Sequence, residues 1–302
     1  MELKFADLAA ATSGFGKESL MAEGGRSGPV YRAVLPGDMH VVVRVMESAR
    51  GLEEKEAAAA FREISRLRHR NVLPLFGYCI SGREKLALYE YMERGDLHRW
   101  LHELPAGRPD GEDCTGDSWE NLPAAASAVG DWPTRHRIAL GIARGLAFLH
   151  QGWVGSHTPV VHGHLVPSNV LLSDDLEPRI ADFAGGGSPD AAATAEDDVY
   201  SYGVLVMELV TGSCRCADEI ERVRGIVRSG QTAAMVDAVD RRLQLEAEWE
   251  KEALECLRVG YLCTAGPPEK RPSMQQVVAL LKDIRRDSAA GNGGGGGASS
   301  SS

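Results

Sequence analysis

The stretch that decides the fold is VVHGHLVPSNVLL, residues 160–172. Before it, Trp132-Pro133-Thr134 predicts the start of a helix, because Pro occupies a first-turn position and apolar residues then recur every three or four positions. Those apolar residues are Ile138, Ile142, Leu146 and Leu149. After it, residues 199–210 are apolar nearly all round, as expected of a buried central helix. The sequence thus predicts a polar loop that is reached from one helix and followed by a buried one.

Loop 160–172 resembles the catalytic loop of eukaryotic protein kinases, His-Arg-Asp-Leu-x-x-x-Asn. The frame and Asn169 are kept, but Gly163 stands at the Arg position and His164 at the position of the Asp that accepts the proton of the substrate hydroxyl. Val166 stands where that family often has Lys. The open question is therefore whether the fold still catalyses a reaction.

Further segments resemble plant receptor-like kinases, most closely their leucine-rich-repeat class, in the right order over about residues 1–287. The resemblance implies an α+β, bilobal protein-kinase fold, with a small β-rich N-lobe containing helix C and a larger, mainly α-helical C-lobe. The expected divisions are a juxtamembrane-like lead-in over 1–20, an N-lobe over 21–92, a C-lobe over 93–287 with a flexible acidic insert at 102–131, and a disordered Gly/Ser tail over 288–302.

Residues 22–31 align with the nucleotide-binding loop Gly-x-Gly-x-x-Gly-x-Val. Its positions fall on Glu23, Gly25, Gly28 and Val30. Glycines suit such a loop because backbone N–H groups must approach phosphate oxygens without a side chain between them. The carboxylate of Glu23 opposes a polyanion, and an ordinary hairpin turn remains an alternative because glycine-rich turns are common.

The strand predicted at residues 41–45 strengthens the match, since the family has Val-Ala-Val-Lys there. Arg44 replaces the phosphate-binding Lys with a wide planar fork, and Val42 replaces an Ala beside the adenine ring. Both changes oppose ATP. The resemblance also assigns Tyr89, Met92 and Leu171 to the nucleotide pocket.

Residues 52–68 predict helix C, with Glu63 at the position of the family's conserved helix glutamate. An Arg44–Glu63 ion pair would hold this helix inward without nucleotide; the alternative is a solvated Glu63. The resemblance also places Leu67, Leu75, His162 and Phe183 in a stack through both lobes, anchored by Asp198.

Asn169 and Asp182 match the family's two magnesium ligands, and carboxylate and amide oxygens suit a hard cation. Against that, the Asp-Phe-Gly motif reads Asp-Phe-Ala, ending at Ala184. Only residues 185–195 then precede the segment that resembles the central helix, so the activation loop and its Ala-Pro-Glu platform are missing. We expect binding of ATP and Mg²⁺ to be weak or absent.

The bulk composition limits the partners. A formal net charge of −10 argues against nucleic acid or an anionic membrane as a main partner. The six Cys are scattered and no His is spaced as a metal ligand, so neither a disulfide framework nor a zinc site is expected. No apolar run reaches the roughly 18 residues of a membrane span, and the first 20 residues lack the pattern of a signal peptide. We therefore expect a cytoplasmic chain, at the inner face of the plasma membrane if it is part of a longer receptor.

Two functional hypotheses follow. The first is a pseudokinase that acts by binding other receptor-like kinases or adaptor proteins. The second is a low-activity protein serine/threonine kinase that uses Arg44, His164, Asn169 and Asp182. A third alternative, a gene-model or splicing error across residues 184–196, leaves the changes at Arg44 and His164 unexplained.

Overall fold

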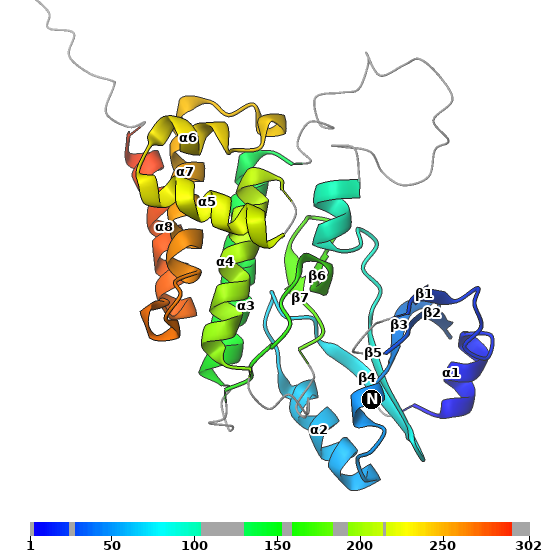
Figure 1. Ribbon diagram of the computed structural model, residues 1–302. Coiled ribbons are helices and arrows are strands. Elements are labelled where there is room, and N and C mark those ends of the chain that lie inside the picture. The colour runs from blue at the N-terminus through cyan, green and yellow to red at the C-terminus, as the bar shows by residue number, and fades with distance from the viewer. Residues whose placement is uncertain are drawn as a thin grey trace, which may run out of the picture.

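The computed structural model describes residues 3–23, 28–103, 130–152, 159–183, 193–213 and 216–291. They form two lobes, one built around a sheet and the other around helices (Figure 1). The first lobe contains α1 (Phe5–Ala11), β1 (Leu20–Ala22), β2 (Val30–Leu35), β3 (Met39–Val45), α2 (Glu54–Arg66), β4 (Leu75–Ser81) and β5 (Glu84–Glu90). The second contains α3 (Trp132–Gln151), β6 (Val170–Leu172), β7 (Pro178–Ile180), α4 (Ala195–Thr211), α5 (Ala217–Ser229), α6 (Thr232–Asp237), α7 (Ala247–Cys263) and α8 (Met274–Gly291).

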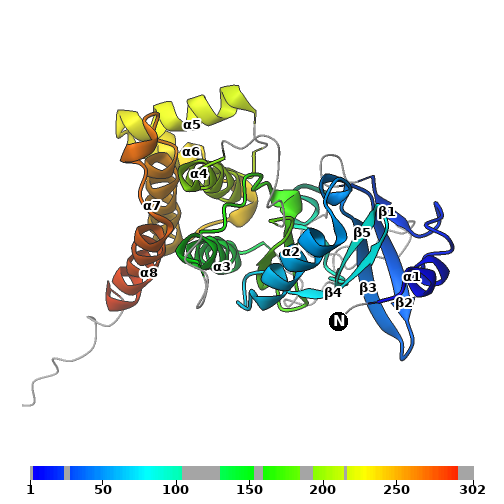
Figure 2. The same ribbon diagram turned by 90° about the horizontal axis from the view of Figure 1, so that it is seen from below.

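The N-lobe is a five-stranded antiparallel sheet in the order β1-β2-β3-β5-β4, with α1 and α2 on opposite faces (Figure 2). Successive side chains of a strand point to opposite faces of the sheet, so β3 serves both faces. Val41, Val43 and Val45 point to a core that includes Leu8 of α1. Because the side chain of Arg44 points to the opposite face, the sheet presents it toward the C-lobe.

The C-lobe is organised around α4, whose residues from Asp198 to Thr211 are mostly buried. Its ends are set by local chemistry: Thr194 and Asp197 form a reciprocal capping box, and Gly212 adopts the left-handed conformation at the C-terminus. α3 and α7 pack against this helix, as Figure 1 shows for α3. The bilobal kinase fold expected from the sequence is confirmed.

The bounds of several elements differ from the expectation. The helix predicted over 52–68 spans 54–66, and the short helix α6 was not predicted. The predicted end of the lead-in, residue 20, is the first residue of β1, and Leu8 before it is fully buried in the N-lobe core. α8 runs to Gly291, past the predicted start of the tail.

Residues 104–129, most of the predicted acidic insert, lie outside the described residues. Within the described ranges, no helix combines the length and the apolar content that a membrane span requires.

Candidate functional site

Asp198 near the start of α4 fixes the backbone of the loop at 160–172. Its carboxylate accepts hydrogen bonds from the backbone N–H of His162 at 2.7 Å and of Gly163 at 2.8 Å. It also contacts Nε2 of His150, on α3, at 2.9 Å. Asp198 is 1% exposed, so these contacts satisfy a carboxylate that burial would otherwise destabilise. The predicted anchoring of the loop on the central helix is present.

His162 is held as a neutral imidazole. Its Nε2 lies 2.9 Å from the carbonyl oxygen of Ala181, and its Nδ1 lies 3.2 Å from the backbone N–H of His164. The second contact requires Nδ1 to accept, so Nε2 carries the proton and donates. Burial lowers the pKa of His162, more than the nearby Asp198 raises it. This residue therefore connects the loop to the Asp182 segment and is not placed to transfer protons.

The changed positions of the loop lie at its exposed side. Gly163 has φ +72°, a left-handed conformation that favours glycine. His164 is exposed, and its carbonyl oxygen accepts a hydrogen bond from Nδ2 of Asn169 at 2.9 Å. Asn169 therefore braces the loop, and its own carbonyl oxygen receives the backbone N–H of Ala181 at 2.8 Å.

Arg44 and Asp182 form an ion pair between the two lobes. The side chains are 17% and 12% exposed, so the contact is largely shielded from water. Asp182 has φ +65°, which is unusual for a residue other than glycine, and it comes directly after the buried Ala181. The position that the family uses for a phosphate-binding Lys thus contacts the position it uses for a metal ligand.

Glu63 and Arg44 have other partners, and the ion pair considered between them is not formed. Glu63 pairs with Arg66, three residues later on the same helix, at 2.9 Å. Its side chain is 52% exposed. Of the two alternatives, the solvated Glu63 is therefore the one present, because Arg66 offers it a partner on the solvent side of α2, while Arg44 contacts Asp182.

The residues assigned to the adenine pocket lie together on the inner face of the sheet and across the cleft. Val42 is directly opposite Tyr89 in the pairing of β3 with β5. Tyr89 and Met92 are buried in one apolar cluster, and Leu171 packs against it. Burial raises the pKa of Tyr89 to about 12, and the nearby Arg44 opposes this shift. The assignment of these residues to a nucleotide pocket stays a prediction.

The glycine-rich loop has a structural explanation at its last position. Gly28 has φ +88°, and a Cβ there would lie 2.1 Å from the carbonyl oxygen of Val45. Only glycine fits so close to a neighbouring strand. Val30 pairs with Arg44 across β2 and β3, and Glu23 is exposed. Gly25 lies outside the described residues, so its assignment stays a prediction.

Mg²⁺ would compete with Arg44 for one of the two residues assigned as its ligands. Asp182, one of the two assigned ligands, is in contact with a guanidinium, and a second cation would be repelled by Arg44. The other, Asn169, holds the loop through its Nδ2, a bond that leaves its Oδ1 as the possible ligand atom. A metal ion would therefore require the Arg44–Asp182 contact to open first.

The four positions expected to stack through both lobes are all buried, but they do not form one cluster. Leu67 and Phe183 belong to the main core, and the His162 side chain is 6% exposed. Leu75 belongs to the separate cluster that contains Tyr89.

Arg271, before α8, contacts the first turn of α4. It donates to the carbonyl oxygen of Glu196 at 2.8 Å and lies 3.5 Å from the carboxylate of Asp197. It also lies over the ring of Tyr200, at 5.1 Å from its centroid. Ala184 and most of the short connector, through residue 192, lie outside the described residues.

Residues 19–185 match the family described as protein tyrosine and serine/threonine kinase. The chain belongs to this family. Among its curated relatives, the calmodulin-binding receptor kinase CaMRLK of Arabidopsis thaliana is 49% identical over 295 residues, which cover 94% of this chain and 42% of the relative. A second protein of that plant is named "Probably inactive leucine-rich repeat receptor-like protein kinase". It is 40% identical, and the match covers 94% of this chain and 35% of the relative.

The leucine-rich repeat receptor protein kinase EMS1, also of Arabidopsis thaliana, is 32% identical over 314 residues, with 94% of this chain and 24% of the relative covered. The chain therefore spans less than half the length of these relatives. The resemblance to the kinase domain of plant receptor-like kinases is confirmed. Leucine-rich repeats belong to other regions of such relatives.

Proposed function

We propose that this kinase-family chain is a pseudokinase: a signalling module that acts through protein–protein contacts, with weak or no ATP binding. The observation that carries the proposal is the contact of Arg44 with Asp182. A guanidinium beside the metal-binding carboxylate supplies within the chain the positive charge that a metal ion would bring. The cleft can therefore keep its charge balance without nucleotide or metal.

The loop supports the same conclusion. His164 replaces the carboxylate that would accept a proton, and its side chain is exposed. General acid–base catalysis is worth about 10²–10⁴-fold, so its loss alone leaves a slow reaction. Gly163 and Val166 remove two further side chains that carry charge in the family. Phosphoryl transfer depends on charge neutralisation and positioning, and these changes act on both.

The alternative is a low-activity protein serine/threonine kinase. Asp182 and Asn169 keep oxygen atoms that can ligate Mg²⁺, and both lie on the loop side of the cleft. This reading requires Arg44 to release Asp182 and His164 to act as base. The kinase alternative is weaker, because nothing among the described residues favours the release of Asp182 by Arg44 or the action of His164 as a base.

Nucleotide binding is tested by thermal unfolding of the full chain with Mg-ATP. We expect no rise in Tm at sub-millimolar ligand, because only a ligand that binds the native state stabilises it. The triple variant Glu23→Gly, Val42→Ala, Arg44→Lys restores the family residues and is expected to gain a rise. A rise for the unaltered protein would refute the claim of weak or absent binding.

Catalysis is tested by phosphate transfer from labelled ATP to a generic protein substrate. We expect the unaltered protein to transfer no more phosphate than Asp182→Asn, the matched variant that lacks the carboxylate at the metal-ligand position. Transfer by the unaltered protein that this substitution abolishes would instead establish the kinase alternative.

The relatives support a proposal about partners and location. Their names describe receptor kinases, which favours other receptor-like kinases or adaptor proteins as partners, at the inner face of the plasma membrane. Co-purification of the chain with the cytoplasmic domains of plant receptor kinases is the direct test, and failure to bind any of them or any adaptor would contradict it.

A further inference from the structure

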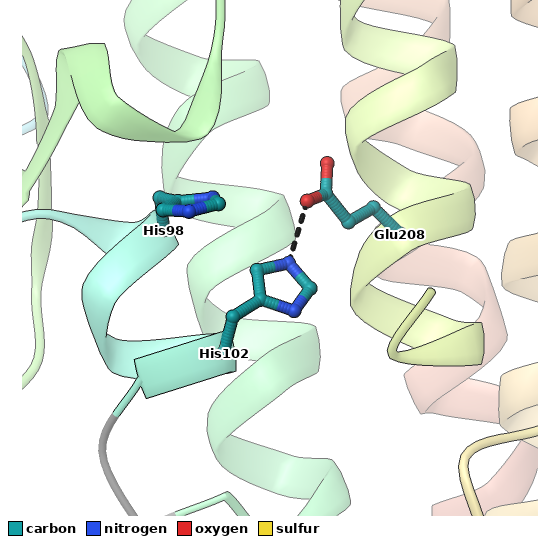
Figure 3. Close-up of side chains that lie close together, drawn as sticks. All are labelled: His98, His102 and Glu208. Atoms are coloured by element: carbon teal, nitrogen blue, oxygen red, sulfur yellow. Dashed lines mark hydrogen bonds and ion pairs between the residues drawn. The ribbon is translucent and has the colours of Figure 1, made fainter. Parts of the chain in front are cut away.

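Two histidines and a glutamate converge in the C-lobe, apart from the cleft. His98 precedes a π-helical turn over Arg99–Glu103, and His102 lies within that turn. Glu208 lies ten residues after Asp198 on α4, about 15 Å along the helix axis at 1.5 Å per residue. Figure 3 shows the two imidazoles on the same side of their segment, directed toward the Glu208 carboxylate.

We propose that His98, His102 and Glu208 form a binding site for a transition-metal ion of the Zn²⁺ class. Potential ligand atoms of the three side chains all lie within 4.8 Å of one another. Imidazole nitrogen and carboxylate oxygen are ordinary zinc ligands, and three protein ligands leave a coordination position for water. Soft thiolate ligands are absent from this set, so the ligand chemistry suits Zn²⁺, Co²⁺ or Ni²⁺.

The geometry needs only small adjustments. Nε2 of His102 lies 2.7 Å from Oε1 of Glu208. Zinc bonds of about 2.0–2.2 Å in a tetrahedral arrangement separate ligand atoms by about 3.3 Å, so an ion entering between these two moves them apart by less than about 1 Å. His98 must approach by up to about 1.5 Å, because its ligand atom lies within 4.8 Å of the other two. Its side chain is 46% exposed, so it is free to change rotamer.

A purely structural hydrogen bond between His102 and Glu208 would not need His98 beside it. The His102–Glu208 contact alone fastens the π-helical turn to α4, and the buried Trp100 and Leu101 pack beside it. His98 lies 3.9 Å from the carboxylate of Glu103, and its ring centroid lies 4.9 Å from that of His102. Glu208 is 4% exposed, and buried carboxylates in proteins are paired or coordinate metals.

A bound ion would replace the direct contact between His102 and Glu208 with a metal bridge that also includes His98. The turn is already held from another direction by Nη1 of Arg242, which donates to the carbonyl oxygen of Leu101 at 3.1 Å. Arg242 is in turn paired with Asp240. A metal ion would join the same turn to the central helix, and its binding energy would stabilise the folded C-lobe.

The test uses the full chain without an affinity tag, freed of metal by dialysis against a chelator and titrated with Zn²⁺ and with Co²⁺. We expect one ion per chain and, for Co²⁺, visible absorption of a low-symmetry site. His98→Ala is expected to weaken binding by at least about tenfold, since even outer-shell changes cost 10–100-fold. His40→Ala is the matched control, because His40 is similarly exposed and lies on β3, in the other lobe.

Thiols are the competing ligands, and among the described residues Cys216 is the exposed free cysteine. Binding there would not respond to His98→Ala. Equal affinity of His98→Ala and the unaltered chain, or less than one ion bound, overturns the proposal. Because His98 is exposed, the metal-free variant is expected to unfold at the same Tm as the unaltered protein, and the gain in Tm on adding Zn²⁺ is expected to disappear.

Discussion

The carboxylate of Asp198 accepts the backbone N–H of Gly163 at 2.8 Å, across 35 residues of sequence. The same carboxylate accepts the N–H of the preceding residue, His162. The loop is therefore held through its backbone, which does not depend on the side chains at 163 and 164. This explains how the loop keeps its shape although the residues that carry charge in the family have changed.

Replacing Asp198 with Asn is expected to cost about 2–4 kcal/mol of unfolding free energy. The substitution removes the charge and turns one acceptor into a donor, which leaves a buried N–H without a partner. Chemical denaturation measures the cost. Asp174→Asn is the control, since Asp174 is exposed, and it is expected to change stability by less than about 0.5 kcal/mol. Equal effects of the two would show that the loop is not held in this way.

Gly163→Ala is expected to destabilise the protein by about 1 kcal/mol. The left-handed φ of +72° disfavours a Cβ, which would also lie 3.3 Å from the Cβ of Ala193. Gly225→Ala, within α5, provides a control of opposite sign. No atom lies within 4 Å of a Cβ at that position, and Ala is favoured in a helix by about 0.5–1 kcal/mol. A stabilising Gly163→Ala would contradict the conformation described.

Local patterns predicted the elements well, because they depend on residues close in sequence. The alternation in β3 and the three- and four-residue steps in α3 are examples. Partner choice was harder, since it depends on how elements are placed in space. Arg44 could not be assigned to Asp182 in preference to Glu63 without knowing which way α2 faces.

The histidine cluster shows the same limit. The sequence predicted no metal site, although His98 and His102 are four residues apart. That spacing alone is a weak signal. The third member, Glu208, is 106 residues from His102, and only the packing of the π-helical turn against α4 brings it near.

Acid is expected to destabilise the protein through His162. Because burial lowers its pKa below the ordinary value of 6.5, the unfolded chain binds more protons than the folded one below that pH. The free energy of unfolding therefore falls as the pH falls below about 6.5, by at most about 1.4 kcal/mol per pH unit for one group. Burial likewise lowers the pKa of His69, which adds a contribution of the same sign.

Unfolding curves of the unaltered chain and of His162→Gln, measured between about pH 7 and pH 5, separate the contribution of His162 from that of His69. The glutamine cannot titrate, so the variant is expected to lose less stability per pH unit, whatever its stability at neutral pH. Parallel pH profiles for the two proteins would show that His162 is not the group responsible.

The contact between Arg44 and Asp182 is expected to be a strong coupling. A double-mutant cycle with Arg44→Met and Asp182→Asn should give about 1–3 kcal/mol, because both side chains are largely buried. The matched cycle is Arg66→Met with Glu63→Gln, an ion pair whose side chains are 56% and 52% exposed. Water and salt screen such pairs, so about 0.2–0.5 kcal/mol is expected there. If the cleft pair couples no more strongly than the surface pair, Arg44 does not hold Asp182 in solution, and Asp182 is again available to a metal ion.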